Sequence, residues 1–338
     1  MNLKSTNLIV VTQRESETFL REGRLAKMEQ LLEPCRVVSA EDCSPQEWES
    51  VLREANPEIV VGGWAMRPLP ANALSELAPA LKYVCYLAGS VRHLVSREQI
   101  AAGLLVTNWG NSISRTISEC ALLLTLSCMR RLTYWAEQMH DKGAWKTPAT
   151  ETQSLFDRRV GLHGFGAIAK ELVPLLRPFT SRISAYTEGM PDEVYQEYGV
   201  EKADSLEALF ANHDVIIEVE ALTPARHKII GEALLRSIPA GGVFVNVARG
   251  ALVDENALVR VVKSTDLQVG LDVFAIEPLP VDHPLRGCRN VTLLPHLSGP
   301  TTDRRIDSAD RAIENLQRFR EGKPLIAPIT CEVYDRST

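Results

Sequence analysis

The sequence predicts an α/β protein that contains two doubly wound parallel sheets. A length of 338 residues exceeds the usual size of one domain. Short apolar runs alternate with longer helix-like segments along nearly the whole chain, which is typical of parallel strands connected by helices. A glycine-rich turn follows one apolar run at residues 164–169 and opens a helix.

The N-terminal part predicts one parallel sheet. Between its strands lie helix-like segments, of which the segment after Ser44 has a capping-box start, with Pro45 at its first position and Glu47 at its third. The predicted strands are residues 8–12, 35–39, 58–63, 81–89 and 104–108.

A long helical region, predicted from about Ser114 to Lys142, precedes a second series of strands and helices. The last helix is predicted for residues 302–321, where apolar side chains recur at spacings of three and four before Gly322. The predicted strands of the second series are residues 160–163, 182–186, 214–219, 243–247, 268–273 and 291–294.

Composition and charge exclude several classes of protein. The net charge of −6 and the lack of a dense basic stretch argue against nucleic-acid binding. The apolar core of the N-terminus, residues 8–11, is too short for a secretory signal, and the longest apolar stretch, residues 120–129, is too short to span a membrane. Seven cysteines without a CxxC spacing favour reduced thiols and no metal site. We therefore expect a cytoplasmic protein.

The glycine-rich turn has the pattern GxGxxA, formed by Gly164, Gly166 and Ala169. Gly164 permits a tight turn, and Gly166 lets the backbone approach a pyrophosphate, whose charge the N-terminal amides of Ala167 and Ile168 would face. The pattern also fits an ordinary turn from a strand into a helix. Its position after a strand, within one βαβ unit, favours a Rossmann-type dinucleotide site.

The end of the next strand bears on the choice of coenzyme. An acid at this position binds the ribose 2′-hydroxyl of NAD, whereas an arginine accepts the 2′-phosphate of NADP. Thr187 occupies the expected position and Glu188 follows it, without a nearby basic residue. Glu218 and Glu220, at a neighbouring strand end, would add negative charge. The sequence therefore favours NAD.

Several stretches together resemble the D-isomer-specific 2-hydroxyacid dehydrogenase family, in order and spacing, across nearly the whole chain. Besides the glycine loop, they are LKYVCYLAGSV (81–91), VTNWGNSISRTISE (106–119), NVARGALVDENAL (246–258), GLDVFAIEPLP (270–280) and LLPHLSGPT (293–301).

The resemblance implies a role for each of three catalytic residues. It implies that His296 is the general acid/base, that Glu277 supports this histidine, and that Arg249 holds the carboxylate and carbonyl of the substrate. It also places backbone amides near Gly89 and Ser90 against the substrate carboxylate. The cofactor contacts that it implies are Gly164 to Ile168, Glu220, Val247, Ala248, Asp272, Ser298 and Gly299.

The same resemblance implies a discontinuous architecture and a homodimer. Residues 1–108 and 298–338 would form a flavodoxin-like substrate domain, and residues 109–297 a dinucleotide-binding Rossmann domain that also carries the dimer contact. Trp64, at a strand end of the first domain, either lines the substrate pocket or only packs. The expected substrate is a small 2-hydroxy or 2-oxo acid.

These residue types suit the chemistry. Oxidation of a 2-hydroxy acid removes a hydride from C2 and a proton from its hydroxyl, and histidine is the base that titrates near neutrality. A carboxylate next to the imidazole fixes its tautomer and favours the protonated form. Arginine binds a carboxylate through two parallel hydrogen bonds and remains charged.

Alternatives remain at the level of sequence. Arg249, Glu277 and His296 each have an ordinary structural explanation, as a surface charge, a turn residue and a strand-end histidine. The turn GSVRH and the segment VEALT (219–223) depart from the family pattern. Formate dehydrogenases fit poorly, because they have glutamine in place of Glu277. A phosphite dehydrogenase and an NADH-sensing corepressor of the same fold remain alternative hypotheses.

Overall fold

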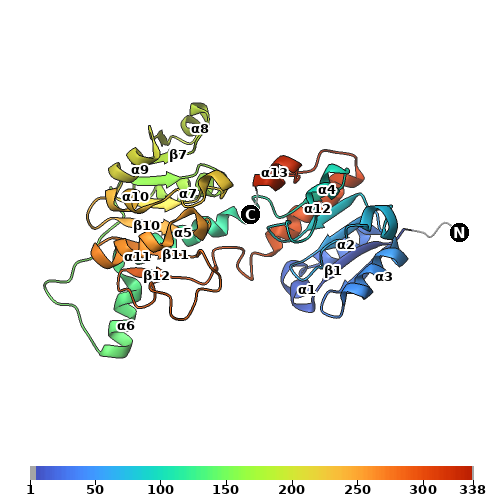
Figure 1. Ribbon diagram of the computed structural model, residues 1–338, viewed down its shortest axis with the longest axis horizontal. Helices are drawn as coiled ribbons and strands as arrows, with labels where there is room; N and C mark the ends of the chain where they lie inside the picture. The colour runs from blue at the N-terminus through green and yellow to red at the C-terminus, as the bar shows by residue number, and fades with distance from the viewer. Residues whose placement is uncertain (1–4, 337–338) are drawn as a thin grey trace. The chain divides into compact units, whose positions relative to one another are not determined.

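The structure is a computed structural model that describes residues 5–336, and it divides into two compact units. Unit 1 combines the chain up to Ile113 with the chain from Pro300 onwards, and unit 2 is Ser114–Gly299. The sequence placed the corresponding boundaries after residues 108 and 297. Each unit contains one parallel sheet (Figure 1).

The sheet of unit 1 has five parallel strands in the order β2-β1-β3-β4-β5, which is the flavodoxin-like order and confirms the predicted fold class. Its central strands are buried along their whole length, because helices cover both faces of the sheet. The strands are β1 (Asn7–Val11), β2 (Cys35–Ser39), β3 (Ile59–Gly62), β4 (Tyr83–Tyr86) and β5 (Leu105–Thr107).

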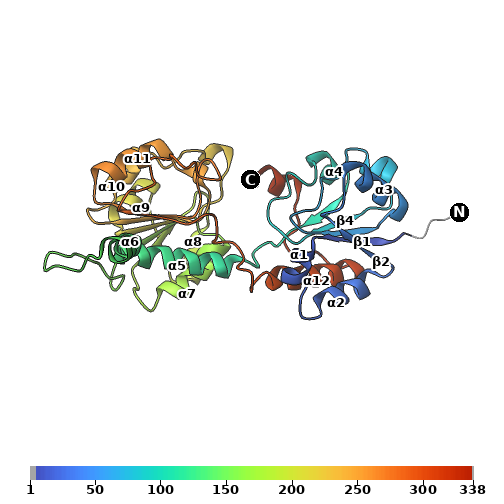
Figure 2. The ribbon, with the colours of Figure 1, turned by 90° about the horizontal axis from the view of Figure 1, so that it is seen from below.

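Helices from both ends of the chain cover this first sheet. Figure 2 shows α1 (Gln13–Phe19), α2 (Arg24–Leu32) and α12 (Ile306–Arg320) on one face, and α3 (Pro45–Ala55) and α4 (Arg97–Ala101) on the other. The predicted capping box of α3 is confirmed. A π-helical turn, Ala73–Leu77, and α13 (Cys331–Arg336) complete the unit.

The sheet of unit 2 has seven parallel strands in the order β12-β11-β10-β9-β6-β7-β8, which extends the Rossmann order by one strand. The order reverses between β6 and β9, so the carboxyl ends of these two strands mark the point where open α/β sheets bind ligands. The strands are β6 (Val160–His163), β7 (Ile183–Tyr186), β8 (Glu201–Lys202), β9 (Val215–Glu218), β10 (Val243–Asn246), β11 (Gln268–Leu271) and β12 (Val291–Leu293).

Two helical layers enclose the second sheet and form two apolar cores (Figure 2). One layer contains α5 (Ser114–Arg130), α7 (Ala167–Leu176) and α8 (Asp192–Glu197). The other contains α9 (Leu206–Asn212), α10 (Glu232–Ser237) and α11 (Glu255–Ser264). Short 3-10 turns at Pro224–Arg226 and Gly250–Leu252 precede α10 and α11.

The prediction and the structure differ at one helical region and at one strand. The helical region expected for residues 114–142 is divided at Arg131, whose φ of 51° lies in the left-handed region, so a separate helix α6 (Leu132–Lys142) follows. The strand β8 was not predicted, because its two residues are exposed and carry no apolar pattern.

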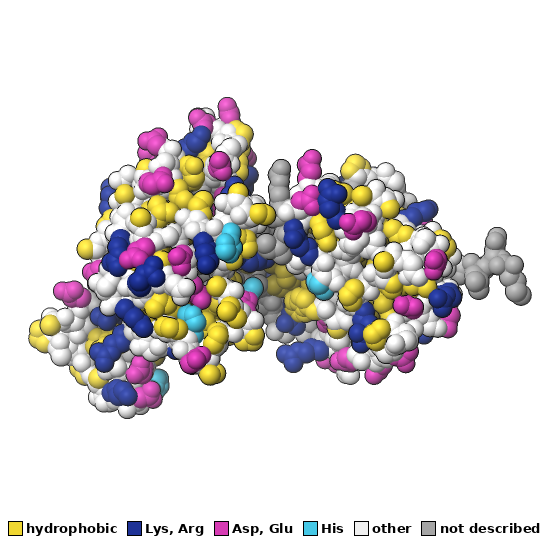
Figure 3. All heavy atoms as spheres, in the orientation of Figure 1, with side chains coloured by type: hydrophobic (Ala, Val, Ile, Leu, Met, Phe, Trp, Pro, Cys, Tyr) yellow, Lys and Arg dark blue, Asp and Glu magenta, His cyan; other side chains and the backbone are white. Residues whose placement is uncertain are grey.

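The surface in Figure 3 shows acidic and basic side chains interspersed over both units. Within residues 5–336, no helix is long and apolar enough to cross a membrane.

Candidate active site

The glycine loop lies between β6 and α7, at the carboxyl edge of the second sheet. Gly164 has φ of +99°, and a Cβ at this position would lie 2.6 Å from the backbone of Glu220, so both conformation and close approach require glycine. A Cβ at Gly166 would meet no atom within 4 Å. Gly166 caps α7 without a side-chain hydrogen bond, which leaves the helix N-terminus open to an anion.

Thr187, which occupies the expected acid position, holds this loop in place. Its Oγ1 accepts a hydrogen bond from the Phe165 amide at 2.6 Å, and its own amide donates to the hydroxyl of Tyr195. Glu188 is exposed immediately after it. Within residues 186–188, Glu188 therefore supplies the carboxylate that is exposed to solvent.

A buried histidine–glutamate pair lies beneath the loop, and the sequence did not predict it. His163 and Glu218 are register partners on β6 and β9, and Nδ1 of the histidine lies 2.5 Å from Oε2 of the glutamate. Their side chains are 3% and 0% exposed. Burial lowers the pKa of His163, but the charge and hydrogen bond of Glu218 outweigh it and raise the pKa above its usual value.

This pairing corrects the expectation that Glu218 would repel a 2′-phosphate, because its charge is buried and bonded. Glu220 remains the second acid at this strand end. Its Oε1 accepts from the Ala221 amide and lies 3.5 Å from Arg226, whereas its Oε2 is buried without a hydrogen-bond partner.

The predicted acid/base pair is formed in unit 2. Nδ1 of His296 lies 2.6 Å from Oε2 of Glu277, and Oε1 of the same carboxylate accepts from the Phe274 amide at 2.9 Å. The side chains of His296 and Glu277 are 47% and 34% exposed. Nε2 of the imidazole bonds no residue of the described chain, so it is the nitrogen available to a substrate.

The backbone fixes the direction of the imidazole. His296 has φ of 55°, in the left-handed region that few non-glycine residues adopt. Asp272, at the end of β11, holds this turn: its carbonyl accepts from the His296 amide, and its carboxylate accepts from the amides of Leu297 and Ser298. Asp272 is fully buried, and its side chain positions this turn; its contact with a cofactor remains a prediction.

Arg249 follows β10 at the same carboxyl edge of the sheet. Its Nη1 donates to the Ala248 carbonyl at 2.7 Å. Desolvation lowers the pKa of Arg249, and the charge of Glu277 acts in the opposite direction, so the guanidinium and this carboxylate lie within electrostatic reach of each other. The structure thus brings Arg249, Glu277 and His296 to one edge of the sheet.

A cavity of about 630 Å³ opens beside this pair. Its walls are mainly apolar, and Glu277, Arg286 and His296 supply polar groups. The lining residues are Phe274, Glu277, Pro278, Leu279, Arg286, Leu293, Leu294, Pro295 and His296.

The other predicted cofactor positions lie along the same edge. Val247 and Ala248 follow β10 and are buried, and Ser298 is buried beside Gly299 in the turn after His296. Ala248 donates its amide to the side chain of Asn246 at 3.0 Å, which orders the end of β10.

The substrate positions predicted in unit 1 also gather at one sheet edge. Gly89 and Ser90 follow β4, and a Cβ at Gly89 would lie 2.6 Å from the ring of Trp109. Trp64 follows β3, is 42% exposed, and makes edge-to-face contacts with Phe19 and Trp109. A partly exposed indole therefore stands near the Gly89–Ser90 turn.

Chemically, the cluster in unit 2 can move a proton and hold an anion. The glutamate fixes Nδ1 of His296, which leaves Nε2 to give or take a proton. The guanidinium of Arg249 is suited to a carboxylate and to the oxygen next to it. Among the described residues, no group of three or more histidine, cysteine, aspartate or glutamate side chains could hold a metal ion.

The chain is similar to several known proteins. Residues 122–298 match the family described as D-isomer specific 2-hydroxyacid dehydrogenase, NAD binding domain. A glyoxylate reductase of Korarchaeum cryptofilum is 30% identical over 261 residues, which are 76% of this chain and 78% of the relative. The human glyoxylate reductase/hydroxypyruvate reductase is 28% identical over 85% of this chain and 90% of its own length.

A solved structure supports the fold. The apo form of D-mandelate dehydrogenase from Rhodotorula graminis has a TM-score of 0.80 to this chain at 24% identity, and the match covers 96% of this chain and 97% of the other.

Proposed function

The chain belongs to the D-isomer-specific 2-hydroxyacid dehydrogenase family, an oxidoreductase family that acts on 2-hydroxy and 2-oxo acids with NAD(P), and we propose that it reduces a small 2-oxo acid with NADH, using His296 as the acid/base. The relatives named above are glyoxylate and hydroxypyruvate reductases, which supports a 2-oxo acid as the substrate. The hydrogen-bonded pair of His296 and Glu277, open to solvent at Nε2, is the observation that carries the proposal.

Each polar group has one task in the reaction. Arg249 binds the substrate carboxylate and polarises the C2 carbonyl. His296 Nε2 donates a proton to the carbonyl oxygen as it becomes a hydroxyl, and Glu277 stabilises the imidazolium before that step. Asp272 keeps the backbone of residues 296–298 in place, so the imidazole does not have to be ordered when the substrate arrives.

The residues of the glycine loop fit a dinucleotide. The space around Gly166 and the uncapped N-terminus of α7 suit a pyrophosphate, and Gly164 allows the loop to pass close to Glu220. When bound, the nicotinamide supplies the hydride. We propose NADH over NADPH because Glu188 is exposed at the strand end and no lysine or arginine lies between Ser184 and Lys202.

We further propose that unit 2 binds the coenzyme and unit 1 part of the substrate, with its carboxylate near the amides of Gly89 and Ser90. A homodimer through unit 2 is supported by α6, which has no buried residue. Leu132 and Met139 on this helix and Trp145 after it are 54%, 45% and 71% exposed, and a partner subunit would cover such apolar side chains.

A substrate panel tests the function. Purified protein with NADH should reduce at least one of glyoxylate, hydroxypyruvate, pyruvate and phenylpyruvate, measured by loss of absorbance at 340 nm. Binding of NADH without turnover of any of them would instead favour the dinucleotide-sensing alternative. Phosphite with NAD provides a separate assay for the phosphite dehydrogenase alternative.

A single substitution tests the coenzyme. Glu188→Arg should improve kcat/KM for NADPH relative to NADH, because it replaces a repelling charge with an attracting one. Unchanged selectivity would contradict the assignment of Glu188.

A further inference from the structure

Arg305, at the start of α12 in unit 1, is a half-buried cation without a carboxylate partner. Its guanidinium carbon lies 4.8 Å from the ring centroid of Trp64 and 5.7 Å from that of Phe19. Nη1 donates to the hydroxyl of Thr18 at 3.2 Å, and Nε is buried without a hydrogen-bond partner. Within residues 5–336, Arg305 makes no ion pair, and Nη2 remains for a further ligand.

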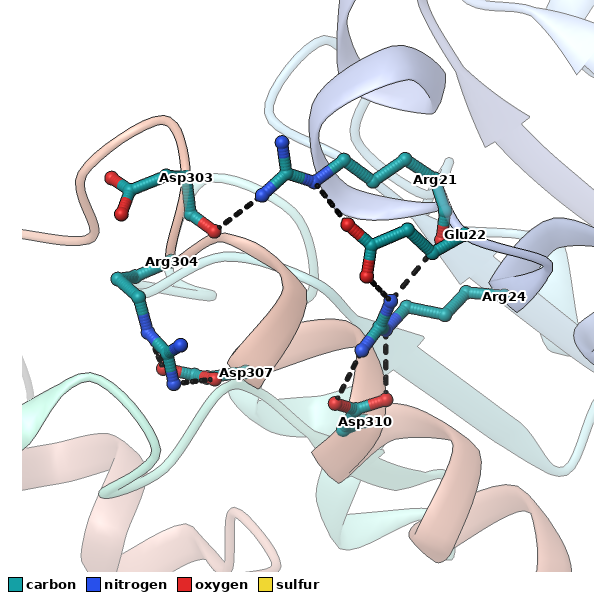
Figure 4. A network of polar contacts seen from close by, with 7 residues as sticks. All are labelled: Arg21, Glu22, Arg24, Asp303, Arg304, Asp307 and Asp310. Atoms are coloured by element: carbon teal, nitrogen blue, oxygen red, sulfur yellow. Dashed lines mark hydrogen bonds and ion pairs between the residues drawn. The ribbon is translucent and has the colours of Figure 1, made fainter.

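Two neighbouring arginines, in contrast to Arg305, are paired with carboxylates, and Figure 4 shows both pairs. Arg24 binds Asp310 through two hydrogen bonds of 2.8 and 2.9 Å, and Arg304 binds Asp307 through bonds of 3.0 and 2.6 Å. The carboxylates of Asp307 and Asp310, on the first turns of α12, are therefore already bound to arginines. The network also connects α2 to α12 and so fixes the position from which Arg305 projects.

Glu15, which attracts the charge of Arg305, does not neutralise it by contact. This glutamate is 5% exposed, and its two oxygens accept the amides of Thr12 and Ala65 at 2.8 and 3.0 Å. Arg14 lies close enough for its charge to lower the pKa of Arg305, in addition to the larger effect of desolvation. The local charge near Trp64 is therefore positive.

Contacts within unit 1 place this cation beside the Gly89–Ser90 turn. One turn after Arg305, the hydroxyl of Ser308 donates to the carbonyl of Leu87 at 2.6 Å, two residues before Gly89. Trp64 contacts Trp109, whose ring lies against Gly89. The same sheet edge thus presents backbone amides, an exposed indole and an unpaired guanidinium.

We propose that Arg305 determines substrate specificity by binding the second carboxylate of a dicarboxylic 2-oxo acid, whose first carboxylate lies at the Gly89–Ser90 turn. This inference rests on the proposed function. A carboxylate at Nη2 would give the guanidinium the partner that the protein does not supply, and the carbon chain of the substrate would lie against Trp64. Neither step requires a change in the reaction at C2.

Matched substrates test the proposal. 2-Oxoglutarate and 2-oxopentanoate have the same chain length, and only the first carries a second carboxylate. For the wild type, kcat/KM with NADH should be about tenfold to hundredfold higher for 2-oxoglutarate, the range expected for a hydrogen bond between charged groups. Equal values, or a preference for 2-oxopentanoate, would overturn it.

Variants separate binding from a structural role. Arg305→Met should abolish the preference for 2-oxoglutarate and affect 2-oxopentanoate far less, whereas the neighbouring Arg304→Met should leave the ratio unchanged. An equal loss with both substrates in Arg305→Met would show that Arg305 only supports the fold. Arg305→Lys, which keeps the charge, should retain part of the preference, and it serves if Arg305→Met does not fold.

The two hypotheses fail in different ways. If the wild type oxidises NADH with neither of these two substrates and with none of the four acids of the panel above, the proposed function is wrong. If it reduces monocarboxylic 2-oxo acids and the dicarboxylic acid gains nothing from Arg305, only the specificity proposal is wrong.

Discussion

Among the three histidine–glutamate pairs of unit 2, two are formed through Nδ1 at nearly the same distance and have opposite surroundings. His163 and Glu218 meet at 2.5 Å and are almost completely buried, whereas His296 and Glu277 meet at 2.6 Å and are partly exposed. Both histidines bind their glutamate through Nδ1, but the first pair lies inside the sheet, whereas the second leaves Nε2 open to a ligand. Exposure, rather than the pairing itself, therefore distinguishes the buried pair from the pair that we propose to be reactive.

The largest effect should come from removing the exposed imidazole. His296→Asn should reduce kcat by about 10²- to 10⁴-fold, the usual cost of losing a positioned acid/base, while the melting temperature changes little. Steady-state NADH oxidation and thermal unfolding measure the two effects. His140→Asn on the exposed helix α6 is a control for loss of a histidine, and an H296N variant within tenfold of the wild type would refute the catalytic role.

Breaking the buried pair should instead affect stability. Glu218→Leu leaves His163 buried without its partner and should lower the free energy of unfolding by about 3–5 kcal/mol. The double variant H163L/E218L replaces both polar groups with apolar ones and should recover most of this loss. Urea unfolding measures both, and equal stability of the single variant and the wild type would contradict the comparison.

Loss of the glutamate should cost less free energy in the exposed pair than in the buried pair. Glu277→Gln should reduce kcat/KM by about 10- to 100-fold, because a charge-assisted hydrogen bond to His296 is replaced by a neutral one. Since Glu277 acts through the histidine, the pH profile of kcat/KM should also shift, and E277D should recover part of the activity. A decrease in rate without any change in pH profile would point to a purely structural role.

The smallest effect concerns pH. The pKa of His163 is raised in the folded state, so the folded chain keeps this proton to higher pH than the unfolded chain. Its contribution to stability is full below about pH 6.5 and is lost as pH rises through the folded pKa, by at most about 1.4 kcal/mol per pH unit. Comparing urea unfolding of the wild type and H163L/E218L from pH 6 to 9 measures it, and an identical pH dependence would contradict it.

Much of the fold was accessible from the sequence because the signals are local. Apolar runs separated by helical segments gave two parallel sheets, and GxGxxA marked the turn before α7. The resemblance to a family brought His296 and Glu277 together, and the structure joins them by a hydrogen bond. Their catalytic roles remain predictions.

The other features depend on tertiary structure. His163 and Glu218 are 55 positions apart in sequence and become neighbours only when β6 pairs with β9. The break at Arg131 lies within a continuous helical pattern, which does not encode a left-handed residue. The role of Asp272 is also set by contacts with the backbone after β12, not by a motif.

Unit 1 combines two segments that lie before and after unit 2 in the sequence, which affects the order in which its parts can fold. The ribosome produces the strands of the first sheet early, but α12, which packs its Ala309, Ile313 and Leu316 on the face formed by Tyr83 and Cys85, emerges after the whole of unit 2. The part of this apolar face that α12 covers is therefore exposed until unit 2 has been translated. The first sheet to leave the ribosome is thus the last to be completed.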